Sequence, residues 1–161
     1  MEYLEYEKSY VGQLRKKIGN GLLIVPTVCA VIPNAQGEIL FIRRSDDGSW
    51  GMPAGSIEIN DSISDCLIRE VREETGLEVL EAQPMAIYSE PRFAFRTFYG
   101  GKHQMFSVVF LVTKWAGHLI TQTDETVDAR FFSLTGQPTI PDPYPEILQD
   151  YQQFEGKLIL K

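Results

Sequence analysis

Cysteine and histidine are scarce in this sequence, and each shortage narrows the chemistry open to it. The 161 residues include two cysteines, Cys29 and Cys66, and two histidines, His103 and His118. The cysteines form no closely spaced pair of the kind that binds metals. We therefore expect both thiols to pack in a core, in a protein of a reducing compartment.

Long hydrophobic runs and excess positive charge are also missing. The longest apolar stretch, near residues 22–32, is far shorter than the ~20 residues that a membrane helix needs. The first residues, MEYLEYEKSY, are acidic and aromatic, unlike a signal peptide. These features predict a cytoplasmic protein with no membrane partner. The net charge of -7 argues against general binding of DNA or RNA, whose phosphates attract the opposite charge.

Two common catalytic motifs are absent as well. The sequence has no G-x-x-x-x-G-K-[ST] segment, so a P-loop kinase or NTPase is not indicated. It has no G-x-S-x-G segment, and its histidines are few, so a serine hydrolase is not indicated either.

What the sequence does have is an organised stretch over residues 50–77, WGMPAGSIEINDSISDCLIREVREETGL. A Gly-rich loop comes first, and an amphipathic helix follows. Ser62 and Asp65 resemble a capping box, with Asp61 or Ser62 as the cap. Gly76 is a natural end for this helix, because glycine adopts the left-handed conformation just past a helix terminus.

The apolar stripe of this helix becomes acidic in its last two turns. The stripe begins at Ile63, Cys66 and Leu67, and the next positions at the same spacing are three glutamates. These are Glu70, Glu73 and Glu74. Like charges on a partly buried face repel and lose hydration, and a hard cation such as Mg²⁺ or Mn²⁺ would remove the conflict. The alternative is an exposed surface on which Arg69 and Arg72 neutralise the acids.

Residues at fixed spacing across this stretch match a known motif. They are Gly55, Arg69, Glu70, Val71, Glu73, Glu74, Gly76 and Leu77. Together they resemble the Nudix box, G-x5-E-x7-R-E-U-x-E-E-x-G-U with U apolar, of the MutT-like Nudix hydrolases. The box covers residues 55–77, and its one departure is Asp61, where the pattern has glutamate.

This resemblance implies an α/β fold, the Nudix α/β/α sandwich with a mixed central sheet and a loop–helix–loop box. We expect a single domain over residues 1–161, with a helical extension at 1–20. The implied activity is divalent-metal-dependent hydrolysis of a pyrophosphate bond in a nucleoside diphosphate linked to another group. The substrate would be a nucleotide, a nucleotide sugar or ADP-ribose. The alternatives are a nucleotide-binding regulatory module with little turnover and a structural domain with salt-bridged acids.

The resemblance also implies roles for individual residues. The metal ligands, for Mg²⁺ or Mn²⁺, would be the Ala54 carbonyl, Glu70, Glu73 and Glu74. Glu70 is a ligand or the catalytic base. Arg69 would orient a glutamate by a paired hydrogen bond. Glu125 is the predicted further acid, as a ligand or the base, with Asp124 and Asp128 as rivals.

Substrate recognition has two candidate segments. Arg44, at a strand end, could fork onto a phosphate, although paired arginines there are commonly plain surface. The second segment is EPRFAFRTFYGGKHQ, in which aromatic residues alternate with arginines. The rings could stack on bases and the guanidinium groups could bind phosphates. The aromatic residues are Phe93, Phe95, Phe98 and Tyr99, and the arginines are Arg92 and Arg96. The alternative for this second segment is a hairpin with aromatic cross-strand pairs.

The remaining elements follow from apolar patterns and turn residues. We predict a helix over 3–18, which either covers its own core or forms a homodimer surface. Strands are expected at 22–25 and 27–32, interrupted by Pro26, and residues 27–43 suggest a hairpin. Further strands are expected at 77–80 and 85–89 around Pro84, at 105–112 and at 118–121, and a closing helix at 145–154.

Overall fold

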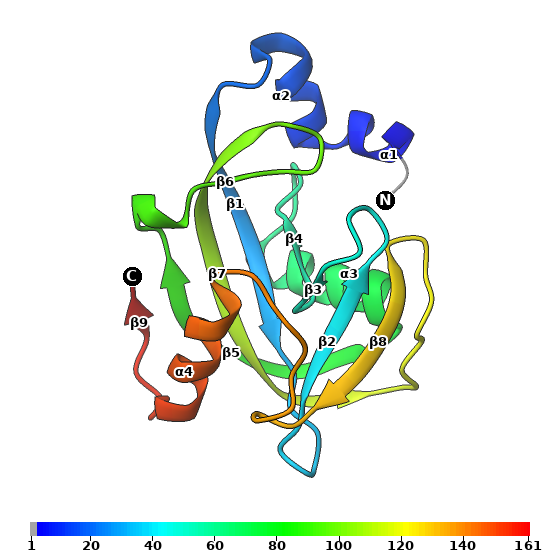
Figure 1. Ribbon diagram of the computed structural model, residues 1–161, viewed down its shortest axis with the longest axis vertical. Coiled ribbons are helices and arrows are strands. Elements are labelled where there is room, and N and C mark those ends of the chain that lie inside the picture. The colour runs from blue at the N-terminus through cyan, green and yellow to red at the C-terminus, as the bar shows by residue number, and fades with distance from the viewer. Residues whose placement is uncertain (1–2) are drawn as a thin grey trace.

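The chain folds into two β-sheets with helices on both sides (Figure 1). A computed structural model describes residues 3–161, with side chains from residue 6 onward. Residues 1 and 2 of the predicted extension lie outside the described residues. The elements run in the order α1 (Tyr3–Lys8), α2 (Tyr10–Ile18), β1 (Leu22–Val31), β2 (Ile39–Arg44), β3 (Trp50–Gly51), β4 (Ala54–Ser56), α3 (Ile63–Thr75), β5 (Glu78–Tyr88), η1 (Pro91–Phe93), β6 (Phe95–Arg96), β7 (Lys102–Ala116), β8 (Thr126–Phe132), α4 (Tyr144–Gln153) and β9 (Ile159–Leu160).

The larger sheet is mixed. Its strands lie in the order β4-β1-β7-β5-β9, and β6 pairs with β7. Strands β1 and β7 run parallel, whereas β5 and β4 are antiparallel to their neighbours β7 and β1. The smaller sheet is antiparallel, in the order β3-β2-β8. This arrangement confirms the predicted α/β class with a mixed sheet.

Alternation along β1 divides the core into two clusters. Val28, Ala30 and Ile32 belong to a cluster that includes the buried residues of α3. Cys29 and Val31 point the other way, into a cluster that includes buried residues of α4. Successive side chains of a strand face opposite sides of its sheet, so one helix covers each face. The alternation of side chains along β1 therefore accounts for the two-sided core of the sandwich.

Two strands run through prolines that were expected to interrupt them. Pro26 lies within β1, at the end of the β4 ladder, whose last pair is Thr27 with Ser56. Pro84 lies within β5, next to a shift of register against β7. Proline is tolerated at ladder ends and bulges because the missing N–H removes no regular ladder bond there. The predicted breaks at these two residues were wrong.

The predicted hairpin over 27–43 is present only at its turn. Leu40 N–H donates to the Ile32 carbonyl at 3.0 Å, and Pro33 bridges Ile39. Beyond the turn the two strands separate, since β1 pairs with β4 and β7, whereas β2 pairs with β3 and β8. Both faces of β1 and β2 carry buried residues, so each strand can take different neighbours and still fill the core.

The segment 118–121 is not a strand, contrary to prediction. Ile120 instead closes the end of the box helix. Its N–H donates to the Thr75 carbonyl at 2.8 Å, and its side chain lies over Gly76, where an added Cβ would come within 2.5 Å of Ile120 Cδ1. The closing helix was predicted within one residue at each end, as α4.

The N-terminal helix is divided in two at Ser9. The Ser9 hydroxyl accepts a hydrogen bond from Gly12 N–H at 3.1 Å and so begins a new helix, as serine commonly does at an N-cap. Both helices lie against the chain's own loops, because Arg15 donates to the Lys102 carbonyl at 2.7 Å. In the described part of the chain, the helices are too short or too polar to cross a bilayer.

The box helix α3 begins and ends as predicted. Ser62 is the N-cap: its hydroxyl accepts from Asp65 N–H at 3.1 Å, and the Asp65 carboxylate accepts from Ser62 N–H at 3.2 Å. Gly76 ends the helix with φ 72°, in the left-handed region. The N-terminal end of the element that carries the box is therefore fixed by local contacts, and its C-terminal end is fixed by Gly76 together with Ile120.

We predict that Ser62→Ala lowers the free energy of unfolding by about 1 kcal/mol, because the orphan N–H groups of the first turn lose their acceptor. Ser64→Ala is the matched control, since Ser64 is exposed in the same turn and alanine favours a helix slightly. Urea denaturation of both variants measures the difference. Equal stabilities for the two variants would contradict the capping role.

Candidate active site

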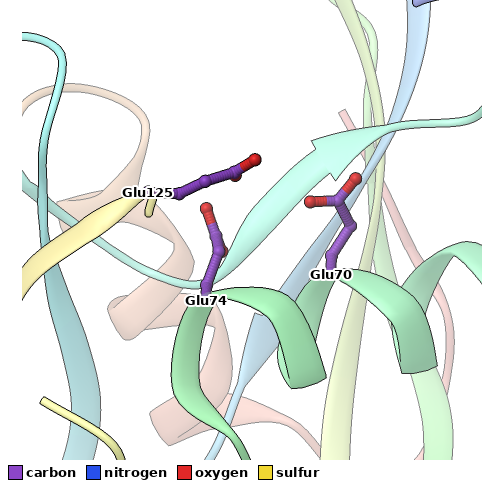
Figure 2. Close-up of side chains that lie close together, drawn as sticks. All are labelled: Glu70, Glu74 and Glu125. Carbon is purple, nitrogen blue, oxygen red and sulfur yellow. The ribbon is translucent and has the colours of Figure 1, made fainter. Parts of the chain in front are cut away.

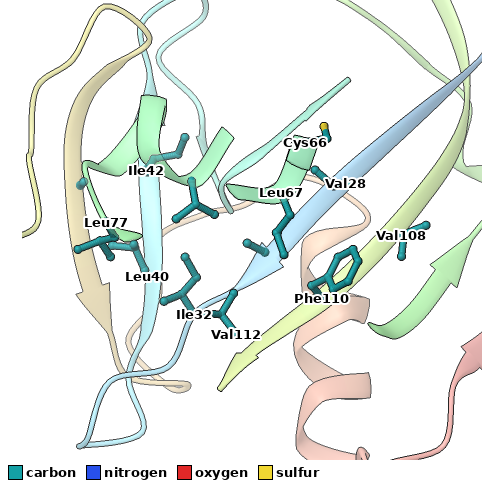
Figure 3. Close-up of a cluster of buried hydrophobic side chains, with 13 residues drawn as sticks. Val28, Ile32, Leu40, Ile42, Cys66, Leu67, Leu77, Val108, Phe110 and Val112 are labelled. Carbon is teal, nitrogen blue, oxygen red and sulfur yellow. The ribbon is translucent and has the colours of Figure 1, made fainter. Parts of the chain in front are cut away.

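The three acids of the box helix divide between core and surface. Glu70 is 5% exposed and Glu74 is 2% exposed, although both are charged residues. Leu67, on the same helix, points into the core cluster beneath α3 (Figure 3). The Glu73 side chain is 47% exposed. The predicted acidic stripe is therefore buried at two of its positions and open to solvent at the third.

The buried pair meets a third carboxylate from a distant part of the chain. Glu70, Glu74 and Glu125 each offer a carboxylate oxygen, and these oxygens all lie within 4.8 Å of one another. Figure 2 shows the side chains converging from α3 and from the start of β8. We call these three residues the acid cluster. In the part of the chain that the structure describes, these three residues are the potential metal ligands among the acids, cysteines and histidines that lie close enough to share one ion. Glu73 does not belong to this group.

The turn before β8 positions Glu125. The Thr123 hydroxyl accepts hydrogen bonds from the N–H groups of Glu125, at 3.2 Å, and Thr126, at 3.1 Å. The two rival acids have other surroundings. Asp128 pairs with Arg130 at 2.7 Å, and the Asp124 carbonyl accepts from the Ser45 hydroxyl at 3.1 Å. The structure therefore brings Glu125 to the box helix and leaves its two rivals outside the acid cluster.

The loop before α3 leaves room for the carboxylates. A Cβ added at Gly55 would lie 1.9 Å from Glu70 Cδ, so only glycine lets this carboxylate approach the backbone so closely. One residue earlier, Ala54 N–H donates to Glu74 Oε2 at 2.9 Å. The predicted ligand Ala54 therefore lies beside the acid cluster, and its N–H already holds one of the acids.

Arg69 ties the acids to the loop. It donates to Glu70 at 2.7 Å, to Asp61 at 3.0 Å and 3.2 Å, and to Glu73 at 3.3 Å. Its Nη2 also donates to the Ser56 carbonyl at 3.2 Å. This contact to Asp61 shows that aspartate is long enough at the one position where the box departs from its pattern. Arg69 thus orients Glu70 by a charged hydrogen bond.

Burial makes the acid cluster electrostatically unfavourable by itself. It raises the pKa of Glu70 to about 7, although the positive charge of Arg69 opposes the shift. Burial also raises the pKa of Glu74 well above its usual range, the negative charge of Glu70 adds to this, and Arg44 opposes it. Three carboxylates in one place suit a hard divalent cation, which prefers oxygen ligands and offsets their charge. The donor set therefore fits Mg²⁺ or Mn²⁺.

Of the predicted recognition residues, Arg44 acts electrostatically on the acid cluster, whereas Arg92 and Phe93 have other partners. Arg44 forms a two-pronged bond to Asp46, at 3.0 Å and 2.7 Å, while its charge acts on Glu74. Arg92 instead donates hydrogen bonds from both terminal nitrogens to the Glu146 carboxylate, at 2.8 Å and 2.9 Å. Phe93 is buried in the core cluster that includes α4.

The third recognition candidate, Arg96, lies at the end of β6. Arg96 donates to the Gly100 carbonyl at 3.2 Å. Next to it, Phe95 stacks edge-on with His103, a cross-strand partner, at 5.4 Å between ring centroids. The contacts of this segment are mostly those of the hairpin alternative. Tyr99 of the predicted segment lies in the loop between β6 and β7. Its stacking partner, Tyr6, could not be predicted because it is distant in the chain.

Comparison with known proteins agrees with the box and the fold. The NUDIX domain model matches residues 23–151. The chain belongs to the NUDIX domain family. This is the family of the Nudix pyrophosphohydrolases, as the motif at 55–77 predicted.

Individual relatives are similar over most or part of their length. An ADP-ribose pyrophosphatase of Methanocaldococcus jannaschii is 26% identical over 122 residues, 74% of this chain and 68% of that protein. The NAD-capped RNA hydrolase NudC of Pseudomonas aeruginosa is 32% identical over 106 residues. That match covers 65% of this chain but spans about a third, 34%, of NudC.

Solved structures share the fold at low sequence identity. The NUDIX domain of Shewanella oneidensis NrtR, solved with ADP ribose, superposes with a TM-score of 0.67 at 17% identity, over 95% of this chain and 98% of that one. A MutT NUDIX hydrolase from Burkholderia pseudomallei gives a TM-score of 0.66 at 20% identity, over 80% and 98%. These likenesses confirm the predicted Nudix fold.

We predict that Glu74→Gln stabilises the metal-free Nudix chain at pH 8 by about 1–3 kcal/mol, because a buried charge beside Glu70 is removed. The amide oxygen of glutamine can still accept from Ala54 N–H. Glu73→Gln, on the exposed side of the same helix, is the control and should change stability by less than about 1 kcal/mol. Urea denaturation with a chelator present measures both. A Glu74→Gln protein less stable than the wild type would contradict this account.

Proposed function

We propose that this Nudix chain is a divalent-metal-dependent enzyme that hydrolyses a pyrophosphate bond in a nucleoside diphosphate linked to another group. The substrate class would be nucleotides, nucleotide sugars or ADP-ribose. The observation that carries the proposal is the acid cluster, because three carboxylates from two separate segments meet there, two of them buried and the third, Glu125, half-buried. Membership of the family supports the reaction type.

The acid cluster would hold Mg²⁺, or Mn²⁺ in its place. Glu70, Glu74 and Glu125 are the ligands that the geometry favours. The Ala54 carbonyl and Glu73 remain predicted ligands from the motif. When bound, the ion supplies positive charge that offsets the charge of a pyrophosphate and makes water a better nucleophile.

The protein's own groups prepare the site for this reaction. Arg69 fixes the orientation of Glu70, and the Ala54 N–H fixes Glu74. Fixed orientation lowers the entropic cost of aligning reacting groups. Glu125 completes the site, either as a further ligand or as the base that accepts a proton from the attacking water. Arg44 is the group that we propose for a substrate phosphate, since its positive charge acts on Glu74 and a guanidinium group can bind two phosphate oxygens.

A small molecule is the proposed substrate, rather than a nucleic acid. The net charge of -7 supports this, because a long polyanion would be repelled outside the metal site. Two relatives have names that mention RNA, NAD-capped RNA hydrolase and RNA pyrophosphohydrolase, so a capped RNA belongs in any test. We also propose a cytoplasmic location, which the two free, buried cysteines support.

We predict that the purified protein, with Mg²⁺ or Mn²⁺, releases phosphate-containing products from at least one of these compounds: nucleoside triphosphates, nucleotide sugars, ADP-ribose and a capped RNA. A chelator should abolish the reaction. Glu74→Gln should lower kcat/KM by about 10²-fold or more, because it removes a charge that the ion needs. Glu78→Gln, an exposed acid just beyond the box, is the control and should keep full activity.

Thermal melting separates the alternatives. Mg²⁺ should raise the Tm of the wild type and leave that of Glu74→Gln unchanged, because a ligand specific to the native state stabilises it. Tight nucleotide binding without products would instead indicate a regulatory module. A Tm that responds to neither Mg²⁺ nor nucleotide, together with no turnover, would indicate a structural domain.

A further inference from the structure

The second N-terminal helix, α2, is fixed to the segment before α3 and to the start of β7. Tyr10 N–H donates to Glu58 Oε2 at 2.8 Å, which joins α2 to the box loop. Arg15 donates to the carbonyls of Gly19, Gly21 and Lys102. Gly101 makes room for this arginine, since a Cβ there would lie 2.8 Å from Arg15 Nε. The extension is therefore held in one place relative to the start of β7.

This anchoring brings together aromatic rings from opposite ends of the chain. The rings of Tyr6 and Tyr99 stack with their centroids 4.3 Å apart and their planes at 16°. Phe98 meets Tyr99 edge-on at 5.4 Å, and its side chain is 64% exposed. We call Tyr6, Phe98 and Tyr99 the aromatic cluster. Three rings at the surface, one of them mostly exposed, form a platform on which a planar ring can stack.

Charges at and around the acid cluster act on Tyr99 of the aromatic cluster. The pKa of the Tyr99 phenol is raised, first because burial disfavours the phenolate, and then because the carboxylate of Asp46 repels it. Arg44 opposes the shift and Glu125 adds to it, so the phenol is within electrostatic reach of both residues. A ligand that touches Tyr99 could therefore extend toward Arg44 and Glu125.

A cavity beside Tyr6 and Tyr99 has the size for part of a ligand. Its volume is about 200 Å³, below the roughly 300–1,000 Å³ of pockets that enclose whole small molecules. On its wall, Lys16 pairs with Glu7 at 3.0 Å, and the terminal nitrogens of Arg15 donate to backbone carbonyls. The two tyrosine rings on the wall offer a planar ring a surface on which to stack.

We infer that the aromatic cluster binds the nucleobase of the substrate, while the diphosphate lies at the acid cluster. The inference rests on the proposed function and assigns a specificity role to Tyr99 and Tyr6. The N-terminal extension then forms part of the substrate site, because it supplies one of the stacked rings. Base stacking on an aromatic side chain contributes about 1–3 kcal/mol per base, so its loss should weaken binding by roughly 5- to 100-fold.

The test compares ligands with and without a base. Calorimetry in the presence of Mg²⁺ would measure the binding of the four nucleoside 5′-monophosphates and of ribose 5-phosphate to the full chain. The wild type should bind at least one nucleotide tenfold or more tightly than ribose 5-phosphate. Tyr99→Leu should remove this preference and leave the binding of ribose 5-phosphate unchanged.

Control variants separate stacking from folding. Tyr99→Phe keeps the ring and should keep the preference. Tyr10→Leu, an exposed tyrosine of the same extension outside the aromatic cluster, should also keep it. Tyr6→Leu should weaken the preference, and it serves as the test if Tyr99→Leu does not fold, as judged by circular dichroism.

Either of two results would overturn the inference: a wild type without the nucleotide preference, or Tyr99→Leu and Tyr6→Leu proteins that fold and retain it. The readout is binding, so it is independent of turnover. If the wild type shows the preference but hydrolyses nothing in the substrate panel, the proposed reaction fails and the aromatic cluster still stands as a base site.

Discussion

The site depends on the burial of two carboxylates from one side of α3. Glu70 and Glu74 are buried close to each other, where ionised groups lose hydration and repel. Backbone and side chains are arranged to hold them there: glycine at 55 leaves space, Ala54 N–H binds one, and Arg69 binds the other. The fold gives up stability at this point, as binding sites commonly do. A divalent cation in the shared space would offset the charge of these carboxylates.

Structural features that depend on residues close together in the chain could be predicted from the sequence. The cap of α3 at Ser62 and its end at Gly76 depend on residues within one turn, so both were predicted correctly. The acidic stripe was less exact, and helical geometry explains why. At about 100° per residue, Glu74 lies roughly 40° from Glu70 toward the core, whereas Glu73 lies roughly 60° away on the side of Arg69. The boundary between core and solvent on this helix therefore passes between Glu73, which is exposed, and Glu74, which is buried.

Contacts between distant segments could not be read in this way. The turn after β1 predicts a hairpin, but only the full set of neighbours shows that β1 and β2 belong to different sheets. Isoleucine is common in strands, so Ile120 was assigned to one. Its actual role at the end of α3 depends on the path of the chain after β7. The stacking of Tyr6 on Tyr99 likewise requires helix α1 to meet the loop between β6 and β7. Glu125 was found because the family resemblance pointed to that region, and Asp124 looked equally suitable by residue type.

Chemistry and recognition occupy separate elements in this molecule. The acid cluster is set by a capped helix and by the turn before β8, both fixed by backbone hydrogen bonds. The aromatic cluster lies on a surface loop and a terminal extension, which contact the box loop through the Tyr10–Glu58 bond. Loops and termini can change without disturbing a core. It follows that the preference for a base can vary while the metal site stays intact, because residues outside the box alone would set that preference.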